Sequence, residues 1–130
     1  MYKGKATVKY FNNWVIANCD EELLNYYRWW IHKKTSLWLS KPKSGAHISV
    51  VRGDMEFGNW PKRMEGERIE FNYNHNLECH SNYIWLPVWG RDLEDIRFKL
   101  GFDRKPLKPF HMSVGNVDMS LSCILKRAFI

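Results

Sequence analysis

The chain has 130 residues, of which 45% are hydrophobic and 26% are charged. This length suits one compact domain, and the hydrophobic content excludes a disordered chain. No apolar stretch approaches the roughly 18 residues of a membrane span, so we expect no membrane partner. The formal net charge of +6 favours anionic partners such as nucleotides or nucleic acid.

The ends and the cysteines indicate a cellular compartment. The residues from Met1 to Ala6 lack the apolar core of a signal peptide. Cys19, Cys79 and Cys123 are odd in number and far apart, and they form no CxxC pair. This usage is typical of reduced, structural cysteines. We therefore expect a cytoplasmic protein.

Patterns of apolar residues predict a mixture of strands and helices. Strands are predicted over residues 5–11, 46–51, 67–73, 78–88, 110–114 and 120–128, and helices over about 20–33 and 92–100. This order indicates an α+β domain with a largely antiparallel sheet. The segments 67–73 and 78–88 read as an antiparallel pair, while the stretch 5–51 could supply a parallel pair.

Two ten-residue segments have the same pattern. Residues 41–50 read KPKSGAHISV and residues 105–114 read KPLKPFHMSV. They share Lys-Pro, four further positions and then His-x-Ser-Val, and each follows a predicted helix and a basic turn. A repeat of sequence and order together predicts an internal duplication with two similar halves.

Each repeat places a histidine and a serine two residues apart in a predicted strand, as His47 with Ser49 and His111 with Ser113. Side chains at positions i and i+2 of a strand share one face. If the two halves pack symmetrically, the four side chains meet in one cleft. Two imidazoles can then act as general acid and general base, and two hydroxyls can bind phosphate oxygens. This chemistry requires neither a metal nor another cofactor.

The paired motif resembles that of the 2H phosphoesterase superfamily, which is named for two H-x-[ST]-x motifs. The matching residues are His47-Ile48-Ser49-Val50 and His111-Met112-Ser113-Val114. The resemblance implies one domain over residues 1–130, with two pseudo-symmetric lobes, mainly antiparallel sheets around a central cleft, and helices on the outside. It also implies an enzyme that cleaves or opens phosphodiesters next to a ribose.

In size, motif spacing and aromatic content the chain is most similar to compact phage-encoded members. These degrade the cyclic oligonucleotide signals of bacterial CBASS immunity. The resemblance implies a viral anti-CBASS hydrolase of the host cytoplasm, with a nucleotide or oligonucleotide substrate and no obligate protein partner. Two alternatives stay open. One is a phosphodiesterase for RNA ends with 2′,3′-cyclic phosphates or 2′-5′ linkages, and the other is a non-catalytic RNA-binding module.

Five further residues are candidates for substrate binding. Lys43 and Lys108 precede the two motif strands, where they could attract phosphates or neutralise developing charge. Tyr10 and Tyr73 end strands and Trp60 lies in a loop, so that any of them could stack on a base. Solvation of the lysines and core packing of the aromatic residues are the competing interpretations.

Two features are not assigned to the site. Strict alternation places Arg52 on the face of Val50 rather than that of Ser49. His75, Cys79 and His80 lie close in sequence, but their spacing matches no standard zinc pattern, so we predict no metal site.

Overall fold

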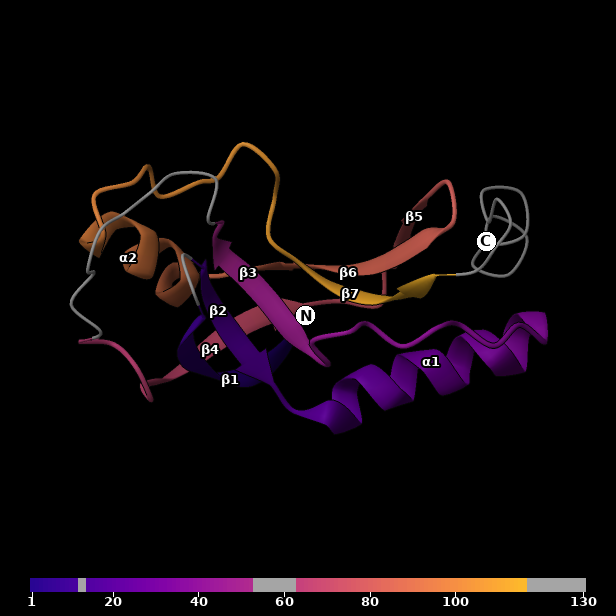
Figure 1. The fold of residues 1–130 in the computed structure, drawn as a ribbon. Helices are drawn as coiled ribbons and strands as arrows, with labels where there is room; N and C mark the ends of the chain where they lie inside the picture. The colour runs from indigo at the N-terminus through magenta and orange to yellow at the C-terminus, as the bar shows by residue number, and fades with distance from the viewer. Residues whose placement is uncertain (12–13, 53–62, 117–130) are drawn as a thin grey trace.

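The computed structural model describes residues 1–11, 14–52 and 63–116 (Figure 1). Within these ranges the chain forms strands and helices in a mixed order, which confirms the α+β class. The elements are β1 (Tyr2–Phe11), β2 (Trp14–Cys19), α1 (Glu21–Thr35), β3 (His47–Val51), β4 (Arg68–Tyr73), β5 (Glu78–His80), β6 (Tyr83–Trp89), α2 (Arg91–Lys99) and β7 (His111–Asn116). The predicted strand over residues 120–128 lies outside the described residues.

The strands form one antiparallel sheet in the order β4-β1-β2-β3-β7-β6-β5. β6 also pairs with β4, so that six of the strands close into a barrel and β5 extends it at β6. Inward and outward positions alternate along the strands, and the inward ones form the hydrophobic core. The largest fully buried side chains are those of Tyr27, Phe71, Leu24, Ile31, Ile48, Ile84, Leu86, Leu93 and Met112. Both helices therefore contribute to the core.

The connection from β2 to β3 decides how these strands pair. α1 has acidic residues in its first turn and basic residues in its last, which suits the helix dipole. It ends at Thr35, and the capping residue Ser36 has a left-handed conformation (φ 61°) and donates its N–H to the His32 carbonyl. The segment 36–46 then runs back along the helix (Figure 1). β3 consequently starts beside the end of β2 and runs antiparallel to it, so the predicted parallel pair is wrong.

Other predicted boundaries also need correction. The segment 78–88 is two strands, because Ser81 has a positive φ of 56° and turns the chain into the β5–β6 hairpin. The segments 67–73 and 78–88 meet only where the end of β4 pairs with the end of β6. β2 was not predicted from the sequence at all. Among the described residues, neither helix has the length and apolar character needed to traverse a lipid bilayer.

Two halves of the chain repeat the same order of elements. One is β1-β2-α1-β3 and the other is β5-β6-α2-β7, and the sheet order is symmetric about the β3–β7 pair. At this pair Ile48 faces Met112. These two residues hold the same position in the two His-x-Ser-Val motifs, so a local two-fold axis passes between them.

The strand register repeats as well. Each residue pair of the β5–β6 hairpin corresponds to a pair of the β1–β2 hairpin after a shift of 69 residues; for example, His80 faces Tyr83 as Phe11 faces Trp14. Both halves also carry a β-bulge at the same place, at Val50 in one and at Val114 in the other. The predicted duplication therefore extends over the hairpins and the motif strands.

The predicted pair of lobes around a central cleft is wrong. β3 and β7 pair directly, so the two halves share one continuous sheet instead of facing each other across a gap. An unpaired strand edge leaves backbone donors and acceptors exposed, and joining the two edges satisfies them. In addition, α1 packs against β7 and α2 packs against β3, so each helix also contacts the other half.

Candidate active site

The four motif side chains lie together on the outer face of the sheet. His47 and Ser49 alternate along β3 with buried residues, and His111 and Ser113 do the same along β7. All four are partly exposed. The antiparallel register fixed at Ile48 and Met112 sets Ser113 beside His47 and His111 beside Ser49. We call these four residues the quartet.

The register also sets the separation of the two imidazoles. His47 and His111 are diagonal neighbours across the β3–β7 pair, and such neighbours are about 7–8 Å apart. A phosphate group between them could therefore meet one imidazole on each side and one hydroxyl beside each. The quartet forms on a continuous surface and not in a cleft between lobes.

Both imidazoles are held by the same hydrogen bond. Nδ1 of His47 lies 3.1 Å from the Gly45 carbonyl oxygen, and Nδ1 of His111 lies 3.1 Å from the Pro109 carbonyl oxygen. A carbonyl oxygen can only accept, so Nδ1 carries the proton in each ring. In the neutral imidazole, Nε2 is then left as the proton acceptor. The backbone thus fixes the orientation and the tautomer of both rings.

The surroundings of His111 favour its neutral form. Burial lowers its pKa below the ordinary value of 6.5, and the positive charges of Lys108, Arg52 and His47 lower it further. The hydrogen bond to Pro109 acts in the opposite direction and raises it. The net effect is a neutral imidazole near pH 7.

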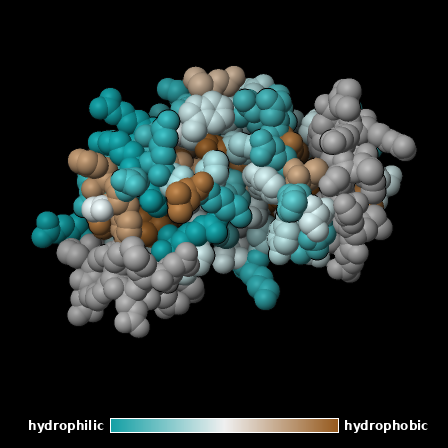
Figure 2. All heavy atoms as spheres, turned by 90° about the horizontal axis from the view of Figure 1, so that it is seen from above, coloured by the Kyte–Doolittle hydropathy of each residue, from teal (hydrophilic) through white to brown (hydrophobic). Residues whose placement is uncertain are grey.

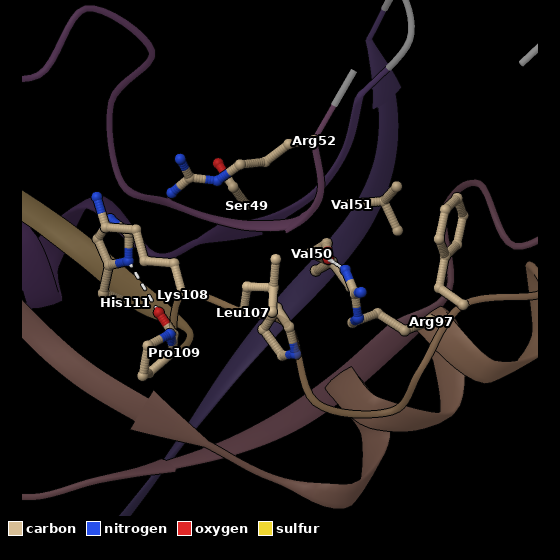
Figure 3. A pocket seen from close by; sticks show the side chains of 11 residues that line it. Ser49, Val50, Val51, Arg52, Arg97, Leu107, Lys108, Pro109 and His111 are labelled. Carbon is tan, nitrogen blue, oxygen red and sulfur yellow. Dashed lines mark hydrogen bonds between the residues drawn. The ribbon is translucent and has the colours of Figure 1, made fainter. Parts of the chain in front are cut away.

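A pocket of about 420 Å³ opens beside His111 and Ser49 (Figure 3). The bulge at Val50 explains how Arg52 comes to line it. Because Val50 has no partner in the β2–β3 pairing, Val50 and Val51 are both buried and the alternation shifts by one residue. Arg52 thereby emerges on the face of Ser49, and its side chain extends across Ser49 toward His111 (Figure 3).

The far wall of this pocket is built around Arg97 of α2. Its Nε donates to the carbonyl oxygen of Asp103 at 2.7 Å, and its Nη1 donates to that of Val50 at 3.0 Å. The guanidinium also lies over the ring of Phe102, 5.5 Å from the centroid. Arg97 therefore ties α2 and the following turn to the end of β3.

A second pocket, of about 430 Å³, lies on the other side of His111. It is lined by Ser113 and Lys108 together with residues of β5 and β6, among them Tyr83 and Trp85. Trp85 contacts His111 edge-on, with 6.2 Å between ring centroids. The sequence predicts an aromatic residue beside the quartet, but it does not single out Trp85.

The five predicted substrate-binding residues differ in where they lie relative to the quartet. Lys108 lines both pockets. Lys43 is exposed in the turn before β3 and lines neither of them. Tyr10 and Tyr73 take inward-facing positions of their strands and pack against the core, so they are not brought to the quartet. Trp60 lies outside the described residues.

The surface around the site is mixed in character. Figure 2 views the molecule from the side on which the segment before β7 lies, where hydrophilic residues cover most of the described surface and hydrophobic residues form smaller patches. Over residues 1–11, 14–52 and 63–116, no group of three or more His, Cys, Asp or Glu could hold a metal ion. His75, one of the residues considered for zinc, is instead hydrogen-bonded through Nε2 to the hydroxyl of Tyr2 at 2.7 Å.

No family model matches the chain, and neither the curated proteins nor the solved structures contain a match. The evidence on function is therefore the geometry of the quartet and its two pockets.

Proposed function

We propose that this chain is a metal-independent phosphodiesterase that cleaves ribonucleotide phosphodiester bonds, as the resemblance to the 2H phosphoesterases implies. One observation carries the proposal. A local two-fold axis gathers two histidines and two serines on one face, and each imidazole makes the same Nδ1 hydrogen bond. A solvated His-x-Ser pair with no chemical role would need neither the second copy nor the matching orientation.

In this proposal His111 is the general base and His47 the general acid. Burial and nearby positive charges keep the pKa of His111 low, so its Nε2 is free to accept a proton near pH 7. His47 stands diagonally across the strand pair, where its Nε2–H can reach a leaving group on the opposite side of the phosphorus. The hydroxyls of Ser49 and Ser113 donate hydrogen bonds to the non-bridging oxygens.

The attacking group is the ribose 2′-hydroxyl next to the scissile phosphate. A histidine pair does not lower the pKa of water as a bound zinc ion does, whereas a vicinal hydroxyl is already in position. His111 accepts the 2′ proton, the bond between O2′ and phosphorus forms, and the bond to O5′ breaks as His47 protonates that oxygen. The products are a 2′,3′-cyclic phosphate and a free 5′-hydroxyl.

The favoured substrates are cyclic oligonucleotides of the kind used as immune signals. In a phage, such an enzyme would act as an anti-CBASS protein in the host cytoplasm. RNA ends with 2′,3′-cyclic phosphates or 2′-5′ linkages are the alternative substrates, and binding without turnover would indicate an RNA-binding module.

The test is a panel of cyclic di- and trinucleotides, 2′-5′ oligoadenylate and RNA with a 2′,3′-cyclic phosphate end, with products separated by chromatography. We expect turnover of at least one of them, and we expect EDTA to leave the rate unchanged. His47→Ala and His111→Ala should each lower the rate by about 10²–10⁴-fold, the usual contribution of a positioned acid or base.

His32→Gln is the matched control, because His32 stacks on Trp38 with 3.5 Å between centroids and lines neither pocket. Its rate should stay within about twofold of the unmodified protein, as is usual for surface changes. Full activity in both alanine variants would refute the proposal. If the best substrate has 3′-5′ linkages, its 2′-deoxy analogue should bind without being cleaved, and cleavage would show that water attacks.

A further inference from the structure

The quartet is symmetric, but the charges beside it are not. When the two repeats are aligned on their His-x-Ser-Val motifs, Arg52 corresponds to Asn116 and Lys108 corresponds to Ser44. Both cations lie on the same side of the local two-fold axis, where the end of β3 meets the start of β7, and both line the pocket beside Ser49. The equivalent positions on the other side are neutral.

This asymmetry is not explained by binding of the reactive phosphate. A phosphate centred on the axis would meet two imidazoles and two hydroxyls related by symmetry. It would therefore contact the same groups on both sides. The pocket instead extends from the quartet to Phe102 and Leu107, and its volume of about 420 Å³ is in the range of small-molecule sites. It can hold a group much larger than one phosphate, next to the quartet.

The two cations are suited to an anion. Arg52 is exposed, and its guanidinium extends over Ser49 in Figure 3. Among the described residues, the ion pairs of the structure join Lys41 to Glu21, Arg68 to Asp20 and Arg104 to Asp95, so no carboxylate there occupies Arg52 or Lys108. Arg97 already donates hydrogen bonds to two backbone carbonyl oxygens and forms part of the pocket wall. A guanidinium and an ammonium together are a common means of binding phosphate.

We propose that the pocket between β3, α2 and the start of β7 is a subsite for a second phosphate, the one adjacent to the scissile phosphate in the chain of the substrate. This inference rests on the proposed function, because it takes the quartet as the place of the reactive phosphate. Arg52 and Lys108 bind the second phosphate, and the apolar wall at Phe102 and Leu107 packs against the attached nucleoside. The substrate class is thus nucleotides with at least two consecutive phosphodiesters, and mononucleoside cyclic phosphates bind poorly.

The test measures binding by calorimetry with deoxynucleotides, which lack the attacking hydroxyl. The probes are d(ApA), which has one phosphate, and the same dinucleotide with a further phosphate at the 5′ or the 3′ end. We expect one of the two phosphorylated forms to bind roughly tenfold more tightly than d(ApA), the effect of one charge-assisted hydrogen-bonding group. In Arg52→Gln this gain should disappear, while the affinity for d(ApA) should change by less than about twofold.

Lys43→Gln is the matched control, since it removes the same charge from the turn before β3 but outside both pockets. It should keep the gain. The salt dependence supplies a second readout, the slope of log affinity against log salt concentration. Its magnitude for the two-phosphate ligand should exceed that for d(ApA) by about 0.7 in the unmodified protein, and this excess should vanish in Arg52→Gln.

Two results would overturn the subsite. If Arg52→Gln weakens the binding of both ligands equally, Arg52 contacts the reactive phosphate. If neither added phosphate increases the affinity, the pocket binds no second phosphate. The deoxy ligands are bound and not cleaved, so this binding test does not depend on turnover in the substrate panel. A failure of the proposed function and a failure of the subsite can therefore be told apart.

Discussion

His47 and His111 hold equivalent positions and make the same hydrogen bond, yet they have different neighbours. Burial lowers the pKa of His111, and the positive charges of Lys108 and Arg52 lower it further. In the other repeat the positions equivalent to these two cations are Ser44 and Asn116, which carry no charge. Residues outside the repeated motif therefore give the two imidazoles different surroundings, as the proposed division into one proton donor and one acceptor requires.

The low pKa of His111 should also appear in the pH dependence of folding. Because the unfolded chain binds a proton at His111 near pH 6.5 and the folded chain binds it only at lower pH, the free energy of unfolding should decrease as pH falls through this window. In His111→Asn the decrease should be smaller, since the side chain no longer titrates. Urea titrations between pH 7 and pH 5 measure it. Parallel curves for the two proteins would contradict a lowered pKa.

The composition of the quartet could be predicted from the sequence because the i, i+2 rule needs only two regular strands. Strict alternation puts Arg52 on the wrong face because a bulge at Val50 cannot be recognised in a run of apolar residues. The sequence does not reveal Trp85, because its position beside Ser113 depends on β6–β7 pairing between segments that are distant in sequence. Tyr10 and Tyr73 end predicted strands, and a strand end alone does not distinguish an exposed aromatic residue from one packed in the core.

Both helices and most of the strands follow from the sequence pattern, while β2 and the strand partners do not. β2 is hard to recognise because its outward residues Trp14 and Ile16 are apolar, which hides the alternation. The predicted parallel pairing is wrong because segment 36–46 brings the chain back to the end of β2, where β3 starts. Beyond the motif, the paired hairpin positions share no identical residue, so the duplication is visible there only in the register.

Gly115 in β7 permits a close approach of another segment. A Cβ atom there would lie 2.7 Å from the Leu39 Cβ and 2.7 Å from the Ser40 carbonyl oxygen. The contact is part of a bridge in which the backbones of Ser40 and Asn116 exchange hydrogen bonds. Gly115→Ala should therefore lower the free energy of unfolding by about 1–3 kcal/mol, as overpacking usually does. Urea denaturation measures this change, and Ser40→Ala, which adds no atom to the contact, should leave stability within about 0.5 kcal/mol. An unchanged midpoint in Gly115→Ala would show that the 39–40 segment does not pack on β7.

The two halves are joined more closely than two separate lobes would be. They share one sheet at the β3–β7 pair, and α1 and α2 each pack against a strand of the opposite half. Buried residues of both halves form one continuous core. The quartet takes its shape from this junction, because each half supplies one histidine and one serine.

Such a junction should make unfolding a single cooperative transition. Leu24 of α1 and Leu93 of α2 are both fully buried, one in each half. Leu24→Ala and Leu93→Ala should each lower the free energy of unfolding by about 2–5 kcal/mol, the usual effect of truncating a buried leucine. If the core is shared, each variant should shift the whole transition, with the same midpoint by far-UV circular dichroism and by tryptophan fluorescence.

Two separated transitions, or a loss confined to one probe, would show that the halves unfold independently. The quartet would then depend on the docking of two preformed units, and any cleavage found with the substrate panel should be lost on heating before the secondary structure. With a shared core, the proposed activity and the secondary structure should be lost together.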